Sequence, residues 1–152
     1  MRSTNSLTLY RQLLMHIARM HNDVDYRRTI NAYMNNVPGR IRKQYPAVSV
    51  GAECNGFRHV GNQHITAQKS DFDNIIFYAL IANYGQLNNY DPISGNYVGH
   101  CAENYAATKV LEELRNTKIF PIRLSDIRFT DAIQPRTWKM VDWCSICHTI
   151  FD

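Results

Sequence analysis

The chain has 152 residues and a formal net charge of +4 at pH 7. Apolar residues make up 45% of it and charged residues 20%, which is typical of one globular domain and excludes wholesale disorder. No apolar run approaches a membrane span, and the amino terminus leads into an amphipathic stretch, so we expect no secretion signal. Four cysteines are too few for a disulfide-stapled small protein of this length.

Two helices are predicted in residues 1–45. Apolar residues recur every three or four positions over 7–20, which indicates an amphipathic helix with Asn5 or Ser6 as its N-cap. The same period continues over 26–37. We expect both helices to cover a sheet.

A β-hairpin follows, with strands predicted over 48–52 and 57–61 and Asn55-Gly56 as its turn. Helical periodicity returns over 72–83. The polar segment 85–97 then predicts a long loop. Loops of this length in compact domains are often functional, and this one can form a wall or a lid of a pocket.

The carboxyl-terminal third predicts one more helix over 102–116 and strands over 119–124 and 127–129. Pro135 marks a loop, after which the chain reaches the C-x-x-C motif at 144–147.

Three thiols and one carboxylate carry the chemistry of this sequence. Cys101, Cys144 and Cys147 can hold a tetrahedral Zn²⁺ with its fourth position open, where zinc lowers the pKa of a bound water. Predicted helix amino termini at both motifs stabilise the thiolates. Glu103 lies two residues after the first ligand, so it can transfer protons without binding the metal.

Other interpretations remain open for the same residues. His100 or His148 can complete a closed Cys₃His site, which would make the metal structural. The C-x-x-C pair can also be redox-active, although it lies far from the thioredoxin-like setting that such pairs favour. We interpret Cys54, in the predicted turn, as a free thiol.

The pattern Cys101-Ala102-Glu103 followed by Cys144-Ser145-Ile146-Cys147 resembles the cytidine deaminase-like superfamily, and so does the hairpin over 48–62. Trp143 stands where the family usually has proline, and residues 65–98 form a long insertion. The resemblance implies an α/β fold, a three-layer sandwich with a small mixed sheet covered by helices, truncated after the C-x-x-C helix. It implies a single domain over 1–152, with a helical cover over 1–45 and a zinc-site core over 46–152.

The resemblance also implies an activity. Family members hydrolytically deaminate nucleobases, with three zinc ligands at the positions of Cys101, Cys144 and Cys147 and a proton-transferring carboxylate at Glu103. We expect a cytosine-type base in nucleic acid, and free nucleoside as the alternative. A non-catalytic, zinc-stabilised binding module is a further alternative.

Five residues are predicted to contact the substrate. Asn62 matches the family position at the end of the second hairpin strand, and His100 precedes the first ligand. Phe57, Tyr97 and Trp143 can stack on an unpaired base.

The mild positive charge is compatible with a polyanionic partner. The chain most resembles toxin deaminase domains of bacteria, which implies action in the cytoplasm, delivery within a longer secreted protein and an immunity protein as a partner. We expect no membrane association.

Overall fold

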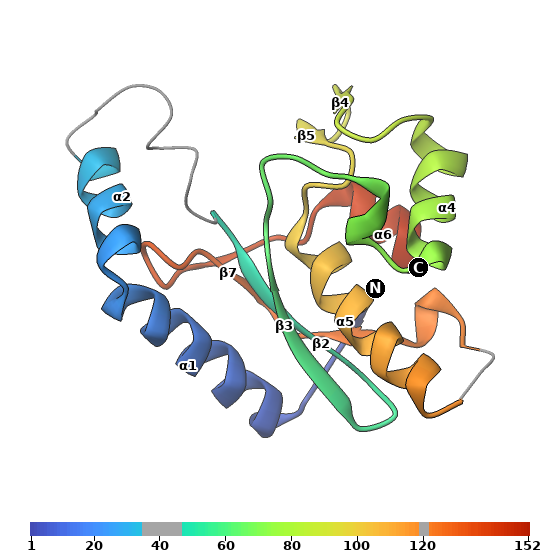
Figure 1. Cartoon of the computed structure of the whole chain (residues 1–152), viewed down its shortest axis with the longest axis horizontal. Coiled ribbons are helices and arrows are strands. Elements are labelled where there is room, and N and C mark those ends of the chain that lie inside the picture. The colour runs from blue at the N-terminus through green and yellow to red at the C-terminus, as the bar shows by residue number, and fades with distance from the viewer. Residues whose placement is uncertain (35–46, 119–121) are drawn as a thin grey trace.

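The computed structural model describes residues 1–34, 47–118 and 122–152. Within these ranges a six-stranded mixed sheet has helices on both faces (Figure 1). The expected α/β fold with a small mixed sheet is therefore confirmed. The helices are α1 (Leu7–Asn22), α2 (Val24–Met34), α4 (Asn74–Tyr84), α5 (Ala102–Asn116) and α6 (Ser145–Phe151), with short 3₁₀ helices at Lys69–Asp71 and Leu124–Asp126.

The sheet is built around one long antiparallel hairpin. Strands β2 and β3 pair along their whole length, and the other edge of β2 pairs with β6 and β7. Strand β1 then joins β6 in parallel, and β8 joins β7. The strands are β1 (Arg2–Ser3), β2 (Ser49–Cys54), β3 (Phe57–Asn62), β6 (Arg128–Phe129), β7 (Ala132–Ile133) and β8 (Met140–Val141).

The predicted hairpin turn is confirmed. Asn55 and Gly56 have φ angles of 50° and 83°, the positive values that a two-residue type I′ turn requires. Because side chains alternate along a strand, Val50 and Ala52 face α5 whereas Gly51 faces α1.

Helix α1 begins where the sequence predicts. Ser6 is its N-cap and its hydroxyl accepts a hydrogen bond from the Leu9 amide at 3.2 Å. Leu9, Leu13 and Ile17 recur every four residues and are fully buried, so they form the face that covers β2 and β3. Helix α2 continues from α1, and the part of its prediction beyond residue 34 lies outside the described residues.

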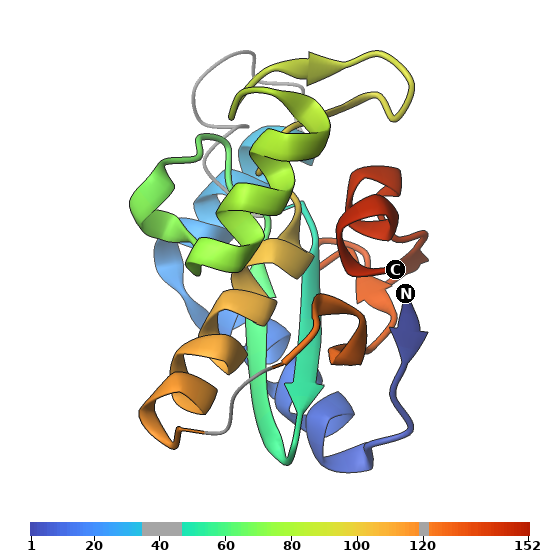
Figure 2. The same ribbon diagram turned by 90° about the vertical axis from the view of Figure 1, so that its right-hand side faces the viewer.

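Helix α5 packs closely on the opposite face of the hairpin. A Cβ atom at Gly61 would lie 2.3 Å from the Ala106 nitrogen, so only glycine allows this approach. The helix predicted over 102–116 matches α5, and the one predicted over 72–83 corresponds to α4. Helices α4 and α6 lie beside α5 on this side of the sheet (Figures 1 and 2).

Two sequence predictions need correction. Of the strand predicted over 119–124, residues 119–121 lie outside the described residues, and the rest is not a strand. The Asp126 carboxylate accepts a hydrogen bond from the Arg123 amide at 3.1 Å, and residues Leu124–Asp126 form a 3₁₀ turn. The predicted loop 85–97 contains a short hairpin of β4 (Tyr90–Asp91) and β5 (Asn96–Tyr97). None of the described helices is both long and apolar enough to cross a membrane.

Candidate metal centre

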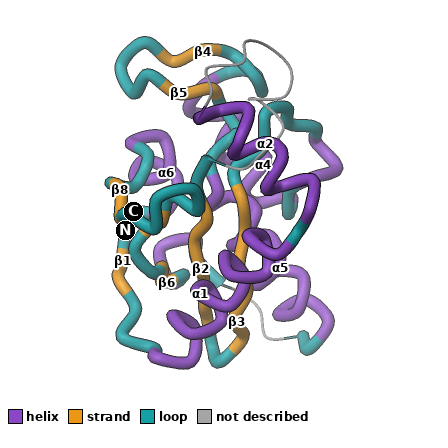
Figure 3. The backbone as a smooth tube through the Cα atoms, turned by 90° about the vertical axis from the view of Figure 1, so that its left-hand side faces the viewer, coloured by secondary structure: helices purple, strands orange, loops and turns teal. Residues whose placement is uncertain are grey.

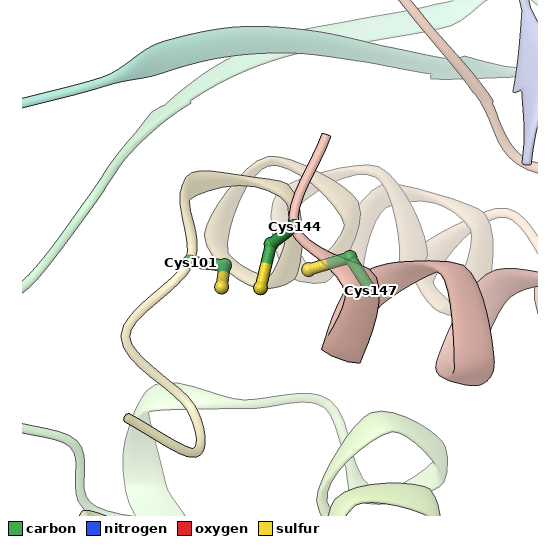
Figure 4. A group of neighbouring side chains, drawn as sticks. All are labelled: Cys101, Cys144 and Cys147. Atoms are coloured by element: carbon green, nitrogen blue, oxygen red, sulfur yellow. The ribbon is translucent and has the colours of Figure 1, made fainter. Parts of the chain in front are cut away.

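Cys101 meets Cys144 and Cys147, which are distant from it in sequence, between α5 and α6. The Sγ atoms of Cys101, Cys144 and Cys147 all lie within 4.8 Å of one another (Figure 4). Thiolates that share one zinc at about 2.3 Å stand roughly 3.8 Å apart in tetrahedral geometry. The three cysteines are therefore close enough to bind a metal ion.

Two helix amino termini position these thiols. Cys101 is the N-cap of α5, Cys144 is the N-cap of α6, and Cys147 lies in the first turn of α6. Figure 4 shows all three side chains pointing toward one another. Before α5, Gly99 takes a φ of +88°, a conformation that redirects the chain and that other residues rarely adopt.

The thiols share negative charge unequally. Hydrogen bonds from Cys101 and Cys147 lower the pKa of Cys144 to about 3. The same hydrogen bonding raises the pKa of Cys101 far above its ordinary value, and burial does so for Cys147. The cluster therefore carries a half-buried thiolate at Cys144, which a cation would neutralise.

Glu103 lies beside the cluster. Its side chain is only 2% exposed, and its Oε2 atom lies 3.5 Å from the Cys147 sulfur. Burial raises the pKa of Glu103 to about 7, and the charge of Cys144 adds to that effect. Both protonation states are therefore populated near neutral pH, which suits a group that accepts and donates a proton.

A small cavity of about 100 Å³ opens onto this group. Asn96 reaches it from β5, and its Nδ2 donates to the Cys144 sulfur at 3.2 Å. Of the loop predicted over 85–97, Asn96 therefore lines this cavity. The residues around the cavity are Val48, Gln63, Asn96, Cys101, Ala102, Glu103, Asp142 and Cys144.

Asn62 was predicted to lie in the pocket, and the structure places it elsewhere. Its Oδ1 atom hydrogen-bonds with His16 Nε2 of α1 at 2.9 Å and accepts from Ser49 Oγ at 2.6 Å. Alternation along β3 directs Asn62 to the α1 face, whereas the next residue, Gln63, lines the cavity.

Two of the predicted stacking residues lie away from the cavity. Phe57 is at the turn end of β3, where it packs against the core. Trp143 donates from Nε1 to the Thr130 carbonyl at 3.0 Å and lines a neighbouring cavity of about 480 Å³ together with His148. Asp142 borders both cavities.

His100 and Tyr97 lie next to the cluster without lining its cavity. Their rings stack with centroids 5.3 Å apart, and His100 Nε2 hydrogen-bonds with Asn88 Oδ1 at 2.8 Å. Tyr97 is 49% exposed, so its ring remains accessible.

Among the described residues, no histidine or carboxylate oxygen joins the three sulfurs in one cluster. His100 is engaged with Asn88, and His148 lies 3.9 Å from Asp152. A closed Cys₃His site is therefore not formed by either candidate. Cys54 is a free, buried thiol at the far end of the hairpin, as predicted.

Comparisons with protein-family models, with curated proteins and with solved structures find no match for this chain.

Proposed function

We propose that this protein is a zinc-dependent hydrolase that deaminates a nucleobase, with a cytosine-type base favoured. The observation that carries the proposal is the open cluster of three thiols with the buried Glu103 carboxyl beside it. Thiolates are soft ligands that favour zinc, and three of them leave the fourth position free. The arrangement of α5 and α6 is compatible with a deaminase-like three-layer sandwich.

Glu103 performs the proton transfers in this proposal. Deamination replaces an exocyclic amine with oxygen from water, so one proton must reach a ring nitrogen and another must leave with ammonia. A buried carboxyl with a pKa of about 7 can accept and return these protons. When bound, zinc would supply the Lewis acidity that activates the attacking water.

The remaining cavity residues would orient the substrate. Gln63 and Asn96 offer amide groups that can hydrogen-bond to the edge of a base. We favour a base within nucleic acid, because of the net charge of +4 and the resemblance to toxin domains, which also implies a cytoplasmic site of action and an immunity partner.

Sequencing of host DNA and RNA after brief expression tests this function. Base conversions should appear with the wild type and be absent with Glu103→Gln, which keeps the size of the side chain. Glu112→Gln, an exposed position on the same helix, is the matched control and should retain activity. Purified protein is also assayed on free cytidine, and conversion there alone would assign the nucleoside alternative. Equal activity of wild type and Glu103→Gln would overturn the mechanism.

A further inference from the structure

Four charged residues form a row across the sheet at the turn end of the hairpin. Arg58 of β3 pairs in register with Glu53 of β2, Glu53 with Arg128 of β6, and Arg128 with Arg2 of β1. Figure 3 shows these four strands side by side in that order. All four residues line one open cavity of about 490 Å³.

The carboxylate in this row is already paired. Glu53 Oε2 lies 3.2 Å from Arg58 Nε, and its Oε1 accepts the Thr4 hydroxyl. A second carboxylate on the cavity wall, Asp126, accepts a hydrogen bond from the Arg123 amide at 3.1 Å and lies 3.9 Å from the Arg123 Nε. Both negative charges therefore have partners of their own.

Arg2 and Arg128 have no such partner, since within the described ranges neither forms an ion pair with a carboxylate at 4.0 Å or less. They are exposed and occupy directly opposite positions on adjacent strands. Like charges in that arrangement destabilise a sheet. The fold therefore keeps two neighbouring guanidinium groups that form no ion pair with a carboxylate of the described residues, and an external anion can bind them.

We infer that this cavity binds the phosphate backbone of a nucleic acid, with Arg2 and Arg128 as its principal contacts. Guanidinium groups match phosphate oxygens in a bidentate geometry. Arg2 and Arg128 stand one strand spacing apart, roughly 5 Å, and Arg58 lines the same cavity three spacings from Arg2, roughly 14 Å. An extended chain of phosphates can reach both ends of this row, whereas a single anion cannot.

This site is distinct from the thiol cluster. The row crosses β2 near its turn end, whereas Val48 and Gln63 line the thiol cavity beyond the other end. A strand of this length extends roughly 20 Å. The inference goes beyond the proposed function and holds whether or not the cluster is catalytic.

Fluorescence anisotropy with a labelled oligothymidylate of about 15 nucleotides tests the inference. It is done in a Glu103→Gln background, so that turnover plays no part. Arg128→Gln should weaken binding about 5- to 10-fold at about 50 mM salt. It should also flatten the dependence of log affinity on log salt by about 0.7, as expected for one lost phosphate contact. Arg19→Gln, an exposed position near the other end of α1 with the same charge change, should stay within about twofold.

Arg2→Gln provides a second variant and should behave like Arg128→Gln. Equal weakening by Arg128→Gln and Arg19→Gln would overturn the inference, because net charge alone would then explain binding. Binding of pyrophosphate that depends on Arg128, without binding of the oligonucleotide, would also overturn it in favour of a small anion. Without ligand, Arg128→Gln should have a Tm at low salt equal to or above that of the wild type. A clear fall in Tm would show a structural role instead.

Discussion

The two ends of the central hairpin differ in burial and in charge. At the open end, the buried Cys101 and Glu103 side chains and the half-buried Cys144 line a cavity of about 100 Å³. At the turn end, exposed arginines line a cavity of about 490 Å³. Burial perturbs the pKa values of the first group, whereas exposure keeps the second group accessible to a polyanion. One pair of strands thus carries a candidate reaction site and a candidate binding site.

Cysteine substitutions should separate the two ends most strongly. The binding free energy of structural zinc sites is roughly 10–16 kcal/mol, shared among the ligands. Loss of one thiolate should therefore cost about 4 kcal/mol, which is about 1,000-fold in zinc affinity. We expect this for Cys144→Ser, measured by competition with a chromogenic chelator. Cys54→Ser removes a thiol at the turn end and should bind zinc like the wild type. Equal losses in both variants would contradict the assignment of the cluster.

A glycine substitution tests how the thiol end is positioned. Gly61→Ala should lower the free energy of unfolding by about 3 kcal/mol, because its Cβ would contact the α5 backbone at 2.3 Å. Gly56→Ala lies in open space and should cost only about 1 kcal/mol, from its φ of +83°. Urea denaturation measures both. A Gly61→Ala protein as stable as the wild type would show that α5 can shift freely.

At the thiol end, zinc binding should depend on pH. Raised pKa values keep Cys101 and Cys147 protonated at pH 7, so zinc binding must displace two protons. Zinc affinity should therefore rise with pH, by about 100-fold per unit near neutrality. Cys144, with a pKa of about 3, contributes no further proton. Calorimetry in buffers of different ionisation enthalpy counts the protons, and no release at pH 7 would contradict this charge distribution.

The smallest effect is expected at two asparagines. Asn96→Ala removes the hydrogen bond to Cys144 and should weaken zinc binding about 10-fold. Asn62→Ala should leave zinc affinity unchanged and lower the free energy of unfolding by about 1 kcal/mol, since the Asn62 Oδ1 atom hydrogen-bonds with His16 of α1 and Ser49 of β2. Loss of zinc affinity in Asn62→Ala would place that residue nearer the cluster than its hydrogen bonds indicate.

Local patterns predicted much of the fold. The Asn55-Gly56 turn, the cap at Ser6 and the helix after Cys101 all follow from interactions between residues close in sequence. The two-residue strands β1, β7 and β8 were not predicted, because two residues are too few to show an alternating pattern.

The site was predicted in part, for a related reason. Family resemblance suggested that Cys101 lies beside Cys144 and Cys147, and the three sulfurs do lie within 4.8 Å of one another. Asn62 faces α1 and Gln63 lines the thiol cavity, since a difference of one residue along a strand reverses the direction of the side chain. Asn96 was missed because its approach to Cys144 depends on how the β4–β5 hairpin folds back.

The cluster ties a very short helix to the rest of the molecule. Helix α6 has 7 residues, too few to persist alone in water. A metal shared by Cys101 and Cys144 would act as a cross-link that closes a chain loop of roughly 40 residues, an entropic contribution of about 4 kcal/mol if it acts as a disulfide does. On chelation, α6 should therefore lose amide-exchange protection before the central hairpin does. In the proposed zinc protein, metal supply would then govern the lifetime of the carboxyl terminus against proteolysis as well as activity.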